Sequence, residues 1–142
     1  MGTMVTDLAA GRALLETHIS WVVLDEHDVY KLKKPVNFGF LDFTTLERRH
    51  AACVTEVELN SRLTHGVYLG VKPITRDEAG RHSIGGQGEI VDYCVHMRRL
   101  RDGHRLDHLL RQNLVTPELM SRLAVHLAAF HARSSTNAEV EQ

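Results

Sequence analysis

The chain has 142 residues, and 17 Lys and Arg against 18 Asp and Glu give it a net charge of −1. Its length suits one compact domain or a large piece of one, and the charge balance does not indicate a surface for polyanions. With 43% hydrophobic and 25% charged residues, the composition argues against disorder, collagen and coiled coil.

The cysteines and the apolar stretches bear on the cellular compartment in which we expect the protein. Cys53 and Cys94 lack the C-x-x-C spacing of zinc and redox motifs, so we expect no disulfide framework and no structural zinc. The apolar stretches at 21–24 and 123–130 are too short to span a membrane, and no signal-peptide pattern opens the chain. We therefore expect a cytoplasmic protein without a membrane partner.

Strand patterns dominate the first third of the chain. Residues 14–17 and 20–25 are rich in β-branched and aromatic side chains, and 29–33 (V-Y-K-L-K) alternates with period two. This predicts a hairpin preceded by a third strand. Pro35 ends the last of these strands because it has no N–H to donate.

A long helix is predicted over 44–64. Thr44 or Thr45 is a good N-cap, and Glu47, three residues after Thr44, would complete a capping box. Gly66 supplies a stop. Apolar residues recur at helical spacing at Leu46, Cys53, Val57, Leu59 and Leu63.

Two more strands, at 67–75 and 89–100, flank a polar, glycine-rich stretch at 76–88 that we interpret as a flexible hairpin tip. Only helices are predicted beyond them, first at 106–110 and then from Pro117, with Thr116 as its cap. Strands, one inserted helix, two strands and then helices predict an α+β fold with an antiparallel sheet.

Lysines in a buried strand indicate an anion partner, because a desolvated ammonium is costly when it is unpaired. Lys31 and Lys33 share one face of their strand, and Glu56 and Glu58 lie on the following helix. Protein kinases use a strand lysine paired with a helix glutamate to hold the phosphates of ATP. Without a structural context, Lys31 and Lys33 could equally be solvated, with Glu56 at the surface beside Arg49 or Arg62.

Longer segments resemble a known family. They are T-H-I-S-W-V-V-L (17–24), V-Y-K-L-K-K-P-V-N-F-G-F-L-D-F-T-T-L-E-R-R (29–49), C-V-T-E-V-E-L-N-S-R-L (53–63), V-Y-L-G-V-K-P-I-T (67–75) and Y-C-V-H-M-R-R-L (93–100). Together they resemble the N-terminal part of bacterial aminoglycoside phosphotransferase-like proteins, of the type with a P-loop ATPase domain downstream.

The resemblance implies a kinase-like fold. Residues 1–100 would form the N-terminal lobe, with about five antiparallel strands and one long inserted helix. Residues 101–133 would form the hinge and first helices of a truncated C-terminal lobe, and 134–142 a disordered tail.

The same resemblance implies an ATP site. Lys31 would bind the phosphates, with Lys33 as the alternative, and Glu56 rather than Glu58 would hold the lysine. The adenine would lie near Val29 and Met97, close to the backbone of residues 96–98. The turn at 17–20, which includes the Ser20 hydroxyl, would cover the phosphates.

The chain departs from the family pattern after His131, where no H-G-D-x-H motif follows. We therefore expect no catalytic residue and no metal ligand in this chain, Mg²⁺ only in a full-length relative, and no phosphoryl transfer by the chain alone. The alternative is a non-catalytic module that assembles with a partner chain, or self-associates through its last helices. His104 and His108 lack a third zinc ligand, and no nucleic-acid partner is expected for the arginines at 98–105.

Overall fold

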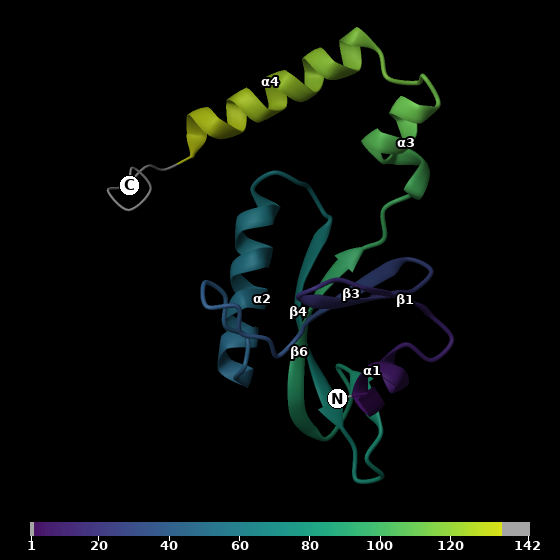
Figure 1. Ribbon diagram of the computed structural model, residues 1–142, viewed down its shortest axis with the longest axis vertical. Helices are drawn as coiled ribbons and strands as arrows, with labels where there is room; N and C mark the ends of the chain where they lie inside the picture. The colour runs from purple at the N-terminus through teal and green to yellow at the C-terminus, as the bar shows by residue number, and fades with distance from the viewer. Residues whose placement is uncertain (1, 135–142) are drawn as a thin grey trace. The chain divides into compact units, whose positions relative to one another are not determined.

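The computed structural model describes residues 2–134, and its fold class is α+β, as the sequence predicted (Figure 1). The strands are β1 (Ala13–Glu16), β2 (Ser20–Leu24), β3 (Asp28–Lys33), β4 (Tyr68–Arg76), β5 (His82–Ile84) and β6 (Glu89–Arg98). The helices are α1 (Gly2–Leu8), α2 (Leu46–Ser61), α3 (Leu106–Arg111) and α4 (Pro117–Arg133), with a 3₁₀ turn, η1 (Asp102–His104), before α3.

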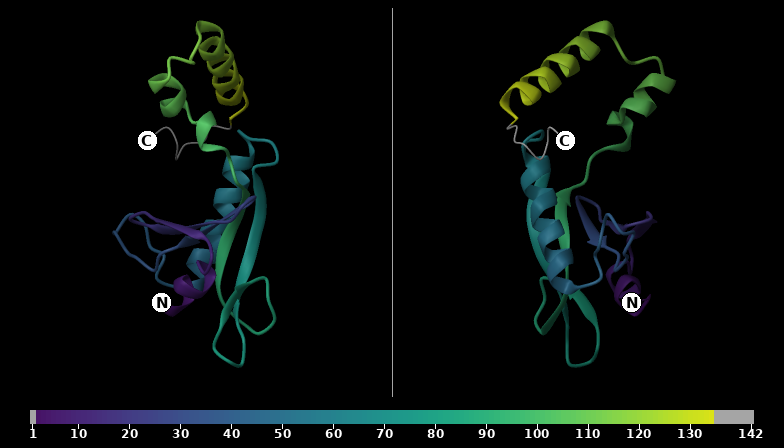
Figure 2. Two further views of the ribbon diagram at one scale, coloured as in Figure 1. Left: turned by 90° about the vertical axis from the view of Figure 1, so that its right-hand side faces the viewer. Right: turned by 60° about the vertical axis from the view of Figure 1, so that its left-hand side comes forward.

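All six strands form one antiparallel sheet in the order β1-β2-β3-β6-β4-β5. The sheet is a strongly twisted half-barrel, and in Figure 2 the first three strands run across the direction of β4 and β6. The prediction of about five strands is wrong by one. The additional strand is β5, inside the stretch 76–88 that we interpreted as a flexible tip.

Tertiary contacts stabilise β5, which explains why its polar, glycine-rich surroundings did not predict it. Ser83 pairs in register with Thr75 of β4, and Ile84 packs against the core. The Asp7 carboxylate of α1 accepts a hydrogen bond from the His82 backbone N–H (3.1 Å) and lies 2.8 Å from His82 Nδ1.

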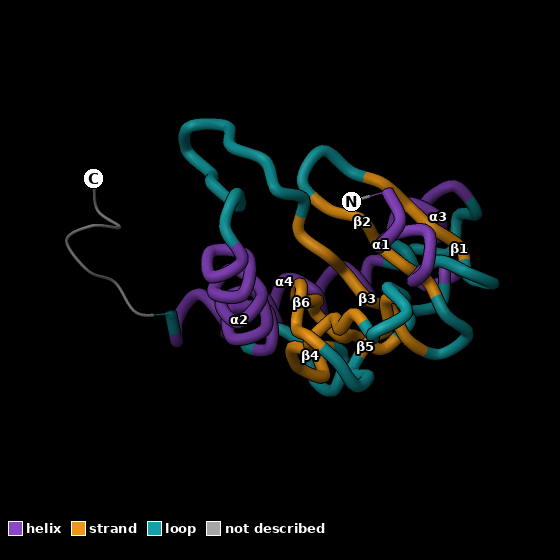
Figure 3. Tube along the Cα trace, turned by 90° about the horizontal axis from the view of Figure 1, so that it is seen from below, coloured by secondary structure: helices purple, strands orange, loops and turns teal. Residues whose placement is uncertain are grey.

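Different helices cover the two faces of the sheet (Figure 3). Side chains of α1 and of four strands form the buried core on one face: Met4, Val5, Leu8, Val23, Leu32, Ile74 and Cys94. Helix α2 packs on the other face, against β6 and β4. Because successive strand residues point to opposite faces, β3 sends Leu32 toward α1, and Lys31 and Lys33 toward α2.

The N-terminus of α2 is capped by Thr45, whose Oγ1 accepts the Arg48 backbone N–H (3.3 Å). The predicted capping box between Thr44 and Glu47 is wrong. The reason is a competing local hydrogen bond: the Thr44 hydroxyl donates to Asp42 Oδ1 (2.6 Å) instead of accepting a helix N–H.

The other end of α2 also differs from the prediction. The helix ends at Ser61, with Arg62 as its C-cap, five residues before the predicted stop at Gly66. Gly66 has a φ of 65° in the connection to β4, where an L side chain would be strained. Strand β6 ends at Arg98 rather than at residue 100.

The chain divides into two compact units, Met1–Arg99 and Leu100–Gln142. In the second unit α4 begins as predicted, since Thr116 Oγ1 accepts the Leu119 N–H (3.1 Å) and Pro117 occupies the first turn. None of its described residues is buried, and Val125 is 70% exposed. The predicted disordered tail, 134–142, lies outside the described residues except for Ser134, which is the C-cap of α4.

Candidate functional site

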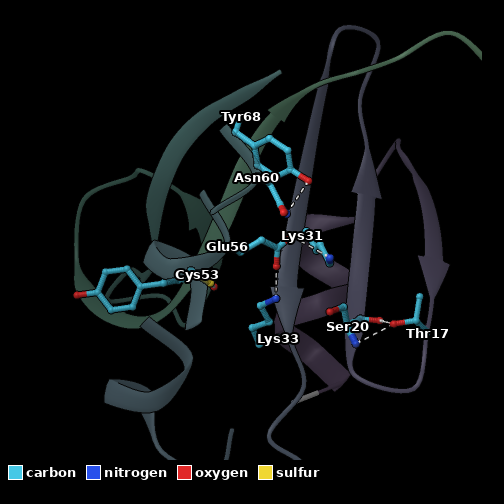
Figure 4. Close-up of polar contacts among 9 residues, drawn as sticks. Thr17, Ser20, Lys31, Lys33, Cys53, Glu56, Asn60 and Tyr68 are labelled. Carbon is cyan, nitrogen blue, oxygen red and sulfur yellow. Dashed lines mark hydrogen bonds and ion pairs between the residues drawn. The ribbon is translucent and has the colours of Figure 1, made fainter. Parts of the chain in front are cut away.

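The structure brings both lysines of β3 to a single carboxylate. Lys31 Nζ lies 2.9 Å from Glu56 Oε1, and Lys33 Nζ contacts the other oxygen, Oε2 (Figure 4). The alternation of β3 places the two lysines on one face, and α2 packs on that face with Glu56 turned inward. Glu58 is exposed and takes no part.

The two lysines differ in their access to solvent. The Lys31 side chain is 30% exposed and that of Lys33 only 6%. The Lys33 ammonium lies 5.6 Å from the centroid of the Phe43 ring, a cation–π contact with a buried aromatic residue. Lys33 is therefore enclosed, whereas Lys31 can reach a ligand.

The Glu56 carboxylate is ionised by its lysines in spite of its burial. Burial opposes the charged form, but the hydrogen bonds and charges of Lys33 and Lys31 outweigh it, so the pKa of Glu56 lies below its ordinary value. Two ammonium groups and one carboxylate leave the cluster with a net charge of +1. An anion is the complementary ligand.

The three charged side chains line an open pocket of about 530 Å³. Leu41 and Phe43, from the connection between β3 and α2, line it as well, and Asn60 Nδ2 donates to the Tyr68 hydroxyl (3.1 Å) at its wall. The pocket thus combines a positive centre with apolar walls, a common composition for small-molecule sites.

Two residues predicted to contact adenine lie on the same face of the sheet. Val29, two residues before Lys31, is buried and pairs in register with Met97 of β6, which is half-buried. They lie outside the lining of the pocket. The Arg98 backbone N–H donates to Val67 O (2.8 Å), so this predicted adenine contact is already engaged.

Ser20, the predicted phosphate contact of the 17–20 turn, pairs in register with Lys33 and is fully buried. Its hydroxyl has no hydrogen-bond partner within residues 2–134. Thr17 orders the turn, since its Oγ1 accepts the Ser20 N–H (3.0 Å). The structure therefore brings Ser20 beside the cluster without exposing its hydroxyl to a ligand.

A buried ion pair beside the cluster was not predicted from the sequence. Arg49 Nε of α2 lies 2.9 and 3.1 Å from the two carboxylate oxygens of Asp92 in β6. Asp92 is 1% exposed and Arg49 8%. The sequence contained one signal: Arg49 lies four residues before the buried Cys53, and so on the same inward face of the helix. Arg49 therefore pairs with Asp92, while Glu56 pairs with the strand lysines.

The two cysteines are free and buried. Burial raises the pKa of the Cys53 thiol to about 11 and that of Cys94 to about 12. Neither thiol is therefore a nucleophile near neutral pH. Over the described part of the chain, no three His, Cys, Asp or Glu residues are grouped to hold a metal ion.

Comparisons with known proteins leave the class of protein open. No family model matches the chain, and no solved structure matches it. Uncharacterized proteins of Mycobacterium tuberculosis (strain ATCC 25618 / H37Rv) and of Mycobacterium bovis are 39% identical to it over 122 residues. The match covers 86% of this chain and 23% of each relative, so the chain spans about a quarter of their length. Between residues 2 and 134, no helix is both long and apolar enough to cross a membrane.

Proposed function

We propose that residues 1–100 are the ATP-binding, kinase-like lobe of an ATP-dependent small-molecule O-phosphotransferase of the aminoglycoside phosphotransferase-like kind. The observation that carries this proposal is the contact between Lys31 of the third strand and Glu56 of the following helix, 2.9 Å long. A lysine on that strand, held by a glutamate on that helix, is the phosphate-binding device of protein kinases.

Charge and access support the same assignment. The cluster carries a net positive charge beside an open pocket, and Lys31 is the lysine with solvent access. In the proposal Lys31 binds the phosphates, Glu56 and Lys33 hold Lys31 in place, and the apolar pair Val29 and Met97 receives the adenine. Ser20 would contact a phosphate only after a change in the 17–20 turn, so the proposal depends on Lys31 and Glu56.

The proposal covers nucleotide binding and assigns no catalytic residue to this chain. Mg²⁺ is assigned to a full-length relative, and the acceptor would be a hydroxyl of a small molecule. We expect the pure chain to release no ADP and to phosphorylate no acceptor. Phosphoryl transfer by the pure chain that Lys31→Ala abolishes would overturn this part of the proposal.

Calorimetric titration with MgATP tests the proposed binding. The wild-type chain should bind, and Lys31→Met should weaken binding about ten- to a hundredfold, since a hydrogen bond to a charged group contributes about 1.5–3 kcal/mol. Lys72→Met is the matched control, because Lys72 pairs with Cys94 on the opposite face of the sheet. No heat of binding from the folded wild type, or equal affinity in Lys31→Met, would refute the proposal.

A second candidate function is self-association through α4, and a specific surface favours it. Val125 is 70% exposed beside an open pocket of about 540 Å³ on one face of the helix, whereas Met120 and Leu127, 43% and 40% exposed, lie on the opposite face. Exposed apolar patches of this kind mark interaction sites. Sedimentation velocity should show association that rises with concentration and that Val125→Glu weakens; a monomer at every concentration would reject it.

A further inference from the structure

The charged cluster contains one lysine more than a phosphate-binding pair needs. Each oxygen of Glu56 has its own lysine, Lys31 on Oε1 and Lys33 on Oε2 (Figure 4). In a simple pair, the lysine divides its positive charge between its glutamate and the phosphate that it binds. Here a second lysine contacts the same carboxylate.

The surroundings of Lys33 make it less accessible to a ligand than Lys31, although both lysines line the pocket. Its side chain is 94% buried, since 6% is exposed, and its ammonium lies against the buried Phe43 ring. Lys31 is five times more exposed. The two lysines therefore have different tasks, although they lie on the same face of the same strand.

Removing a buried carboxylate from its only cationic partner is strongly unfavourable. The Glu56 side chain is only 11% exposed, so it would be subject to that penalty if Lys31 alone neutralised it. Lys33 reduces this penalty, because Glu56 keeps a second charged hydrogen bond when Lys31 divides its charge between Glu56 and a ligand. The carboxylate, and with it α2, can then stay in place during binding.

We propose that Lys33 is a positioning residue that keeps Glu56 ionised and oriented whether or not Lys31 contacts a nucleotide. This deepens the proposed function and rests on it for the role of Lys31. It predicts a preorganised site, in which Glu56 keeps its position and its contact with Lys33 when Lys31 binds a phosphate.

The first experiment needs no nucleotide. An NMR titration follows the Glu56 side-chain carboxyl in the full-length chain, in Lys31→Met and in Lys33→Met. In Lys31→Met the pKa of Glu56 should remain below its ordinary value, because Lys33 still holds the carboxylate. In Lys33→Met it should rise further than in Lys31→Met. A pKa in Lys31→Met at or above the ordinary value would overturn the proposal, and this comparison holds even if Lys33→Met does not fold.

The second experiment measures the Kd for MgATP against pH. Lys33→Met should weaken binding about tenfold, the effect of losing one charged hydrogen bond that acts on the ligand through Glu56. Its Kd should also rise as the pH falls and Glu56 becomes protonated, whereas the wild-type Kd changes less over the same range. Lys33→Arg should restore most of the affinity, because it keeps the positive charge next to Glu56. Lys72→Met controls for the loss of one charge from the sheet.

The outcomes separate the two proposals. If the folded wild type binds no ATP, the proposed function fails, and the NMR titration alone decides the role of Lys33. If the wild type binds ATP and Lys33→Met binds with the same Kd and the same pH profile, the role of Lys33 is refuted while the nucleotide site stands.

Discussion

The buried pair of Arg49 and Asp92 makes the sharpest stability prediction. Strand β3 pairs with β6 only as far as Cys94, and Asp92 lies just beyond that point. The Arg49 guanidinium contacts Asp92 there. Besides its contacts with Asp92, its Nη1 donates to the carbonyl oxygens of Phe43 (3.1 Å) and Thr44 (3.2 Å).

Arg49→Met removes all of these donors at once. Within residues 2–134, Asp92, 1% exposed, would keep only the hydrogen bond from the Tyr93 backbone N–H (2.8 Å). Breaking a buried ion pair from one side costs about 3–5 kcal/mol, a large part of the ~5–15 kcal/mol that stabilises a typical domain. We expect a loss of this size in the free energy of unfolding, measured by urea denaturation at pH 7.

The neighbouring residue provides the matched control. Arg48 makes an ion pair with Asp42, but its side chain is 55% exposed, and surface pairs contribute at most about 1 kcal/mol. Arg48→Met should therefore cost much less than Arg49→Met. Adding Asp92→Asn to Arg49→Met should recover part of the loss, since the buried charge is then gone. Equal losses in the two single variants would refute the reasoning.

Three further perturbations test other parts of the structure. Ser20→Ala removes a buried hydroxyl that has no hydrogen-bond partner in the described chain. The free energy of unfolding should therefore stay within about 1 kcal/mol of the wild-type value or increase. A decrease of more than this in urea denaturation would show that the hydroxyl has a partner. Glu56→Gln should destabilise the chain by about 3 kcal/mol at pH 7. The folded pKa of Glu56 is lower than its ordinary value of 4.5, so the ionised carboxylate stabilises the fold fully above pH 4.5. This stabilisation is lost as the pH falls through the folded pKa. The free energies of unfolding of wild type and Glu56→Gln, measured by urea denaturation, should therefore converge as the pH decreases. A constant difference would contradict this. Asp7→Asn weakens the hydrogen bonds between α1 and His82. Relative to wild type, amide hydrogen exchange in α1 and β5 should accelerate more than exchange in β3. Unchanged exchange in α1 and β5 would contradict a stabilising role of these bonds.

The parts of the site that follow local rules could be predicted from the sequence. Period-two alternation places Lys31 and Lys33 on one face of β3. The helix pattern left Glu56 open between the inward face and the surface, so its pairing with a β3 lysine, which the structure contains, was implied by the family resemblance. The patterns do not choose between the lysines, because that choice depends on Phe43. That residue belongs to the irregular connection between β3 and α2, whose path no periodic pattern describes.

Contacts between distant segments could not be predicted either, because no local sequence pattern describes them. Arg49 and Asp92 are 43 residues apart, and each is an ordinary charged residue in its own segment. Strand β5 depends on α1, 75 residues away along the chain. The cap of α2 was decided by a competing local bond, since Asp42 engages the Thr44 hydroxyl and leaves Thr45 to cap the helix.

The strand order has a consequence for the kinetics of folding. Strands β1 to β3 pair with sequence neighbours, and β4 pairs with the two strands that follow it, β5 and β6, so each half of the sheet can form from contacts within its own segment. Among the described strands, only the β3–β6 ladder joins the halves, and it closes a long loop, for Lys31 pairs with Val95. The pocket takes walls from β3, α2 and β4, so it comes into existence only when that ladder closes. We therefore expect late protection of the β3 and β6 amides at their shared ladder in pulse-labelling exchange. Under the proposed function, nucleotide would then act on the last step of folding.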